Sequence, residues 1–166
     1  MLCSPAATWI TNCLPGSEPQ IRIARPDEYS RVLLVYAALG YRREVDPADT
    51  VWLAETVDEA VGIVRAAEQG TLVLRGMRIA EHARRRRLGT RMLEAIAEWL
   101  GDRECYCVPY PYLVGFYGQI GFAVLEPAAA PAFLAERAAA YRNSGQEAIL
   151  MRRPASRVRI HERIGE

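Results

Sequence analysis

The chain has 166 residues, of which 51% are hydrophobic, so it is predicted to fold as a single domain with its own core. Its 21 basic residues are all arginine and are balanced by 20 acidic residues, which leaves a net charge of +1. This balance excludes a protein that binds polyanions through its overall charge, and the absence of lysine is attributed to a GC-rich coding bias.

The first part of the chain predicts a strand, a helix and then a meander of three strands. A short alternating run ends at a proline, an acidic pair opens a helix that a glycine ends, and two β-like runs flank a polar turn. The predicted elements are a strand at 21–24, a helix at 27–39, a loop at 41–50, a hairpin of strands at 51–56 and 60–66, and a strand at 70–79.

The second part of the chain predicts helices that alternate with short strands. The helix at 88–100 has one apolar face, which includes Leu88, Met92 and Ile96, and it ends at a glycine. The elements that follow are a strand at 104–108, a short helix at 112–119, a strand at 122–125, a helix at 131–144 and a strand at 148–152.

This order of elements predicts the α/β (α+β) class, with a mixed sheet that is flanked by helices. A doubly wound dinucleotide-binding fold is a poor match because the sequence contains no G-x-G-x-x-G. A P-loop is also excluded, since no segment reads G-x-x-x-x-G-K-[ST].

The four cysteines, Cys3, Cys13, Cys105 and Cys107, form neither a disulfide framework nor a C-x-x-C ligand set. A structural zinc site is therefore not expected, and reduced thiols in a cytoplasmic protein fit best. Cys105 and Cys107 alternate along a predicted strand, so both are expected to be buried on the same face of the sheet.

Residues 1–17 carry no charged side chain, yet polar residues and Pro15 interrupt them in a way that a secretory signal does not allow. We expect an N-terminal extension over 1–20, either disordered or the product of a misassigned start codon. One domain over 21–153 and a polar tail over 154–166 follow. No segment is long and apolar enough to span a membrane.

Four consecutive arginines, Arg84 to Arg87, lie between a predicted strand and the predicted helix that begins near Leu88. The first turn of a helix leaves its amides unpaired, and the helix dipole adds partial positive charge there. This context predicts an anion site for a diphosphate. The alternative for such a run is a solvated patch or one that faces a nucleic acid.

A second segment runs from Phe116 to Phe122. Together with the arginine run before the helix, it makes the chain resemble the GCN5-related N-acetyltransferase (GNAT) superfamily over residues 21–153. The diphosphate loop of that family reads Q/R-x-x-G-x-G/A between a strand and a helix. Arg84 takes its first position and Gly89 its last. The family's F-Y-x-x-x-G-F motif matches Phe116, Tyr117, Gly121 and Phe122.

The chain departs from the family pattern at two positions. Arg87 stands where the family has the first glycine of its loop, which is compatible with a loop of negative φ. Tyr110 stands where the family often has an asparagine, so one usual contact to the pantetheine arm is expected to be missing.

The resemblance implies a mixed, mostly antiparallel sheet whose central strands splay apart, with the pantetheine of acetyl-CoA in the gap. It implies that Met77, Arg78 and Ile79 offer backbone partners to this arm. It also assigns the phosphates of the co-substrate to Arg84, Arg85, Arg86, Arg87, Leu88, Gly89 and Thr90. No metal is implied.

The implied reaction is direct attack of an amine on the thioester in a ternary complex. The amine must first lose a proton and the leaving thiolate must gain one. Tyr117 is the predicted general acid, because a phenol with a pKa of about 10 stays protonated at neutral pH. The base stays open between Glu55, Glu81, His82 and a chain of water molecules.

Two other functions compete with acetyl transfer: an acyl-CoA-binding sensor or docking domain, and a nucleic-acid-binding domain that uses the arginine run. The net charge of +1 and the lack of an aromatic-rich basic stripe disfavour the last. The expected partner is therefore a small-molecule or peptide amine, with no nucleic acid and no membrane, and a homodimer is compatible with the sequence. Trp52, Trp99, Phe133 and Tyr141 are assigned to a core or an interface.

Overall fold

A single seven-stranded sheet forms the centre of the computed structural model, which describes residues 18–156. Its strands are β1 (Gln20–Ile23), β2 (Thr50–Glu55), β3 (Ala60–Glu68), β4 (Leu72–Ile79), β5 (Cys105–Cys107), β6 (Ala123–Val124) and β7 (Met151–Arg153). The helices are α1 (Tyr29–Ala38), α2 (Leu88–Leu100), α3 (Val114–Gly118) and α4 (Ala132–Asn143).

Each predicted helix and strand is present, and only their ends differ. The first predicted helix begins as a 3₁₀ turn at Pro26–Glu28 and continues as α1 from Tyr29. A proline fits the first turn because the amide that it lacks would have no helical partner there. The last strand begins at Met151 rather than at residue 148. The helix at 88–100 has the predicted bounds, since its apolar face is periodic from end to end.

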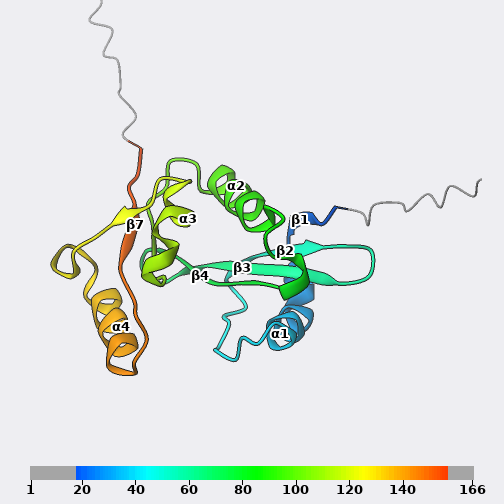
Figure 1. Cartoon of the computed structure of the whole chain (residues 1–166), viewed down its shortest axis with the longest axis horizontal. Coiled ribbons are helices and arrows are strands. Elements are labelled where there is room, and N and C mark those ends of the chain that lie inside the picture. The colour runs from blue at the N-terminus through cyan, green and yellow to red at the C-terminus, as the bar shows by residue number, and fades with distance from the viewer. Residues whose placement is uncertain (1–17, 157–166) are drawn as a thin grey trace, which may run out of the picture.

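The strand order is β1-β2-β3-β4-β5-β7-β6, and every pair is antiparallel except β4 with β5. The predicted mixed, mostly antiparallel sheet is therefore confirmed. In Figure 1, α2 and α3 lie on one face of the sheet, and α1 and α4 lie on the other.

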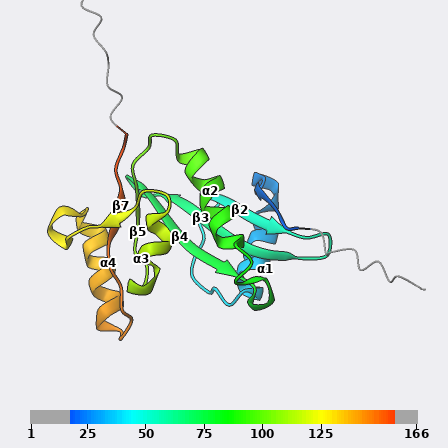
Figure 2. The same ribbon diagram turned by 45° about the horizontal axis from the view of Figure 1, so that its top comes forward.

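The two central strands separate after three paired residues. β4 pairs with β5 only from Leu72 to Leu74, and the chains then diverge (Figure 2). A bulge in β4 adds to this separation, because Arg75 faces Arg65 of β3 whereas Arg78 already faces Ile63. The predicted splay of the central strands is confirmed.

Gly76 lies within this bulge with a φ of 63°, a conformation that costs glycine little. A Cβ atom at this position would lie only 3.1 Å from the Tyr36 hydroxyl oxygen. The bulge of β4 therefore favours a residue without a side chain at this position.

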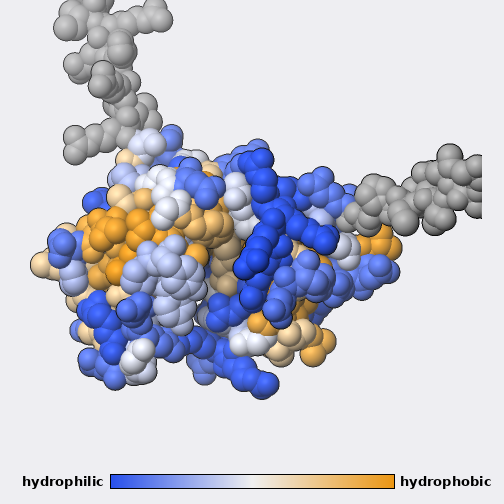
Figure 3. Space-filling model, in the orientation of Figure 1, coloured by the Kyte–Doolittle hydropathy of each residue, from blue (hydrophilic) through white to orange (hydrophobic). Residues whose placement is uncertain are grey.

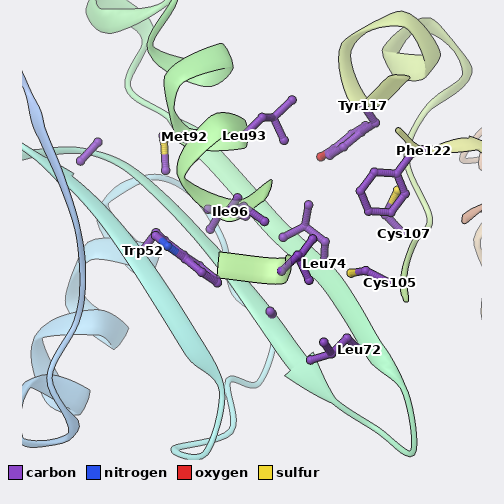
Figure 4. Packing of buried hydrophobic residues seen from close by; sticks show 14 of the residues in the cluster. Trp52, Leu72, Leu74, Met92, Leu93, Ile96, Cys105, Cys107, Tyr117 and Phe122 are labelled. Carbon is purple, nitrogen blue, oxygen red and sulfur yellow. The ribbon is translucent and has the colours of Figure 1, made fainter. Parts of the chain in front are cut away.

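The largest core lies between the sheet and α2. Met92, Leu93 and Ile96 project from α2 toward Trp52 and Leu74 of the sheet (Figure 4). The ring of Trp99 meets the Trp52 ring edge to face, with the centroids 5.0 Å apart. The assignment of both tryptophans to a core is confirmed.

Cys105 and Cys107 are free thiols in this same core, as predicted. Burial raises the pKa of the Cys105 thiol to about 11 and raises that of Cys107 as well. Both therefore stay protonated and unreactive at neutral pH. Cys3 and Cys13 lie outside the described residues.

Most of the predicted N-terminal extension (1–20) and C-terminal tail (154–166) also lies outside residues 18–156. Glu18 and Pro19, which are described, contact Arg91 of α2 through an ion pair of 2.9 Å and a hydrogen bond of 3.0 Å. No helix in the described part of the chain combines the length and apolar character needed to cross a bilayer.

Candidate functional site

A cleft of about 170 Å³ opens where β4 and β5 separate. One wall is the segment 73–78 of β4, and the opposite wall is the chain from Cys107 to Tyr110. Tyr117 of α3, the loop after α1, α4 and the loop before β7 complete it. In Figure 3 the surface is hollowed beside a strongly hydrophilic ridge, which lies over the start of α2.

The bulge of β4 directs different side chains to the two faces of the sheet beside the cleft. Met77 and Ile79 pack against the core under α2. Arg75 and Arg78 instead lie opposite Arg65 and Ile63 of β3, on the face that α1 covers. The cleft thus has an apolar rim on the α2 side and a basic rim on the α1 side.

The segment before α2 presents a series of unpaired amides. Arg91 donates to the Arg87 carbonyl over 3.0 Å and is the first residue of the helix to find such a partner. The amides of residues 85–90 make no backbone hydrogen bond within residues 18–156, and no side chain caps the helix. This is the geometry that a helix N-terminus offers to a phosphate.

Arg87 does not adopt the negative φ that an arginine at this position allows. Arg87 has a φ of 58° and Arg85 a φ of 61°, both in the left-handed region. When successive residues alternate between right- and left-handed backbone conformations, their amides point toward one place. A turn of this kind forms an anion-binding nest. The loop thus keeps a glycine-like conformation without the glycine, at a cost of about 1–2 kcal/mol for each non-glycine residue.

Arg87→Gly is therefore expected to raise the free energy of unfolding by about 0.5–1 kcal/mol, since relief of the left-handed strain exceeds the added entropy of the unfolded chain. Arg86→Gly is the matched control because Arg86 has no positive φ. It should be neutral or destabilising in the same urea titration. Equal destabilisation by both substitutions would contradict the strain at Arg87.

The four arginine side chains are exposed, and Arg84 is also tied to the neighbouring strand. Its Nε donates to the Ile79 carbonyl over 3.1 Å, and Arg78 donates through Nη1 to the Met77 carbonyl over 3.0 Å. Ala80 donates to Val61 of β3, so by the alternation of a strand the Ile79 amide points away from β3, toward the gap.

Gly89 brings the two sequence motifs into contact. A Cβ at Gly89 would lie 3.1 Å from the Phe116 ring and 3.2 Å from Ile79 Cδ1. The start of α2, the end of β4 and α3 therefore meet at this glycine. Leu88 is buried beneath it and Thr90 is half-buried.

Tyr117 is 8% exposed and lines the cleft. Its ring meets Phe116 and Phe122 edge to face, with centroid distances of 5.1 and 6.0 Å. Figure 4 shows the hydroxyl directed away from α3, toward the space between α2 and β4. Burial, and then the neighbouring Cys107, raise the pKa of this phenol well above its usual value, so it is protonated at neutral pH.

None of the three side chains named as candidate bases lines the cleft. Glu55 is held by ion pairs with Arg22, at 2.7 Å, and Arg31. Glu81 and His82 are exposed, and His82 Nε2 lies 2.9 Å from Glu59. The carboxylate that does line the cleft is Glu147, in a polar loop where the sequence carries no recognisable signal.

The loop after α1 is anchored by a buried ion pair. Arg65 is 2% exposed and pairs through Nη1 with Asp49, whose side chain is 4% exposed. Its Nη2 also donates to the Tyr41 hydroxyl, over 3.1 Å, and to the Glu44 carbonyl, over 2.7 Å. This contact positions Tyr41 and the adjacent Arg43, which line the cleft.

Tyr141, which the sequence assigns to a core or an interface, lies at the cleft. It lines the cleft, and its hydroxyl accepts a hydrogen bond of 3.0 Å from Arg43. Arg137, one helical turn earlier on α4, lines the cleft as well. Its i, i+4 spacing from Tyr141 was the signal in the sequence that both side chains lie on one face of the helix. Phe133 does pack against the core under α4.

No group of three or more histidine, cysteine or acidic side chains within residues 18–156 is placed to hold a metal ion. The structure does show a gap between two strands and a buried phenol at one cleft, and it shows a loop before α2 whose amides have no backbone partner among the described residues.

Comparison of the sequence with family models matches residues 11–122 to the acetyltransferase (GNAT) family. The comparison with curated proteins finds no match.

Solved structures of the same fold include an acyl-CoA N-acyltransferase from Pseudomonas aeruginosa, with a TM-score of 0.59 and 16% identity over 82% of this chain and 99% of that one. An N-acetylglutamate synthase from Neisseria gonorrhoeae, complexed with coenzyme A and N-acetyl-glutamate, aligns with a TM-score of 0.61 and 15% identity over 84% of this chain and 35% of that one. Naa50 from Arabidopsis thaliana, in complex with the bisubstrate analogue CoA-Ac-MVNAL, aligns with a TM-score of 0.59 and 14% identity over 81% of this chain and 97% of that one.

Proposed function

The chain belongs to the acetyltransferase (GNAT) family, and from this premise we propose that it is an N-acetyltransferase. In this proposal it moves the acetyl group of acetyl-CoA to an amine by direct attack in a ternary complex. The observation that carries the proposal is the cleft between β4 and β5, which has the Tyr117 phenol in its wall and unpaired amides beside it.

The amides of residues 85–90 would hold the diphosphate of acetyl-CoA, and the exposed arginines of the same loop would pair with its phosphates. The pantetheine arm would lie along the apolar rim, where the Ile79 amide faces the gap. The Met77 and Ile79 carbonyls already accept hydrogen bonds from arginine side chains. We therefore assign the hydrogen bonds between this edge of β4 and the pantetheine arm to backbone amides rather than to carbonyls.

Tyr117 would deliver its proton to the sulfur as the carbon–sulfur bond of the thioester breaks and the carbon–nitrogen bond forms. The amine must be neutral when it attacks, and the proton that it gives up goes to Glu147 or to water in the cleft. The raised pKa of Tyr117 keeps this donor protonated until the thiolate forms.

The acceptor belongs to the same proposal. Among the structures of this fold, one holds N-acetyl-glutamate and another a bisubstrate analogue that contains a peptide, so both small-molecule and peptide amines are candidates. We also propose a cytoplasmic location, on the free state of Cys105 and Cys107.

The proposal is tested first by binding. Acetyl-CoA at one hundred times its dissociation constant is expected to stabilise the fold by about 2.7 kcal/mol, visible as a higher melting temperature. The double substitution Arg84→Ala/Arg86→Ala should weaken this binding, while Arg25→Ala, at the distant exposed start of the first helix, should not. No shift of the folded protein at millimolar acetyl-CoA would contradict the proposal.

An amine panel then separates an enzyme from a sensor. An acetyltransferase releases CoA in the presence of an accepted amine, whereas a sensor or docking domain binds acetyl-CoA without release. If the double arginine variant retains its affinity for CoA but no longer binds RNA or DNA at moderate salt, the arginine run serves a nucleic acid instead.

A further inference from the structure

The wall of the cleft on the α1 side carries an excess of positive charge. Arg43, Arg75, Arg78 and Arg137 all line the cleft, and Glu147 is the one carboxylate among its lining residues. They come from three separate parts of the fold, namely the loop after α1, β4 and α4. We call these four side chains the arginine wall.

The arginine wall lacks the carboxylate partners that several other arginines of the chain have. No ion pair joins any of the four to a carboxylate within residues 18–156. By contrast, the buried Arg65 is paired with Asp49, and Arg22 with both Glu28 and Glu55. Arg75 and Arg137 are half-buried, whereas Arg43 and Arg78 are exposed. A positive charge at a partly desolvated position is costly unless an anion joins it.

Arg137 shows this lack of partners most directly. Its Nη2 donates to Gln69 over 2.9 Å, but its Nη1 is buried without a hydrogen-bond partner among the described residues. Burial and the charge of the neighbouring Arg75 lower the pKa of its guanidinium. An anionic group bound in the cleft would raise this pKa again, because it would stabilise the charged guanidinium.

The other two arginines are already oriented by aromatic rings. Arg43 lies over the Tyr141 ring at 4.7 Å while donating to its hydroxyl, and Arg78 lies over the Tyr41 ring at 5.2 Å. Stacking on a ring face leaves edges of the guanidinium free to donate.

This wall is separate from the loop before α2. Arg75 and Arg78 lie on the sheet face that α1 covers, whereas the loop before α2 continues from the end of β4 into the helix on the opposite face. Tyr117 lines the cleft and packs in the core on the α2 side, so its phenol lies at the passage between the two regions. A group at the arginine wall and the phosphates at the loop would therefore occupy opposite sides of the reacting atoms.

We propose that the acceptor is a small amine that also carries an anionic group, a carboxylate or a phosphate, which the arginine wall binds while Glu147 receives the amine. This inference rests on the proposed acetyl transfer and names the substrate class of the same cleft. The limited volume, about 170 Å³, favours a small molecule over a folded protein surface. Arg75 and Arg137 are the residues that select it.

The test uses the protein saturated with CoA, so that the loop before α2 is filled and no turnover occurs. Calorimetric titration compares matched probes that differ in the anionic group alone: L-alanine with L-alaninamide, L-glutamate with L-glutamine, and phosphoethanolamine with ethanolamine. In at least one pair the probe with the additional anionic group should bind at least tenfold more tightly, and that pair identifies the group as carboxylate or phosphate.

Arg75→Gln and Arg137→Gln should each reduce this preference about tenfold, since a charge-assisted hydrogen bond is lost, without changing the affinity for CoA. An unchanged CoA affinity also shows that each variant is folded. Arg25→Gln, whose side chain is 68% exposed and pairs with Asp27, is the control and should keep the preference.

Two results overturn the proposal: in every pair the probe without the additional anionic group binds as tightly as its partner, or the probes with that group do not bind the CoA-loaded protein. So does a preference that both arginine variants retain. Failure of CoA itself to bind is a different result, which contradicts the proposed acetyl transfer.

Discussion

Tyr117→Phe is expected to lower the turnover of acetyl transfer about a hundredfold or more, while the affinity for acetyl-CoA stays nearly unchanged. The substitution keeps the ring and its edge-to-face contacts with Phe116 and Phe122, so the fold and the wall of the cleft are preserved. It removes the one hydroxyl that we assign to the leaving sulfur. Steady-state CoA release with an accepted amine and calorimetric titration of acetyl-CoA measure the two quantities.

Tyr112→Phe is the matched control, because Tyr112 is 78% exposed and does not line the cleft. It should keep the turnover of the unmodified protein.

The pH dependence of turnover gives a second test of the acid. Tyr117 must be protonated to act, and burial raises its pKa above the ordinary phenol value of 10.0. Deprotonation of Tyr117 should therefore not lower turnover at any pH up to 10.0. Unmodified turnover in Tyr117→Phe would mean that another donor protonates the sulfur.

Asp49→Ala is expected to lower the free energy of unfolding by about 3–5 kcal/mol. Arg65 and Asp49 are 2% and 4% exposed, so the substitution leaves a buried guanidinium without its counter-charge. Since domains of this kind are stable by only about 5–15 kcal/mol, the loss is a large share of the total. Urea unfolding followed by circular dichroism measures it.

Two further variants assign the cause of that loss. Asp58→Ala, at an exposed turn between β2 and β3, should change the stability by less than about 0.5 kcal/mol. The double variant Asp49→Ala/Arg65→Met should recover much of the loss, because it removes the orphaned charge and retains apolar volume. A loss below about 1 kcal/mol in Asp49→Ala would contradict a buried ion pair in solution.

The anchor at Arg65 also bears on the acceptor. Its hydrogen bonds to Tyr41 and Glu44 hold the loop that supplies Arg43 to the cleft. Loss of the ion pair would therefore disturb the arginine wall before it affects the loop that precedes α2.

Local patterns in the sequence were sufficient for most of the elements. The helix at Leu88–Leu100 was predicted with its observed bounds because its apolar positions repeat with the helical period and a glycine follows it. The alternation of Cys105 and Cys107 likewise predicted a shared buried face. The two motifs led to the correct family because their residues, spacing and order are local properties of the chain.

The conformation of Arg87 did not follow from its residue type. A φ of 58° is unfavourable for arginine, and only the assembled loop between β4 and α2 shows that this conformation is adopted. The bulge of β4 also required the structure, since it is a property of how β4 pairs with β3 rather than of β4 alone.

By itself, then, the sequence determined the order of helices and strands, the class of sheet and the family, because periodicity, turn residues and motif spacing act over short stretches of chain. Only the tertiary structure decided which side chains share the cleft. It removed Glu55 from the candidate bases by pairing it with Arg22, and it brought Arg75, Arg137 and Tyr141 together from β4 and α4. Arg75 is more than sixty positions from Arg137 and Tyr141 along the chain, and the packing of α4 against the sheet is what makes them neighbours.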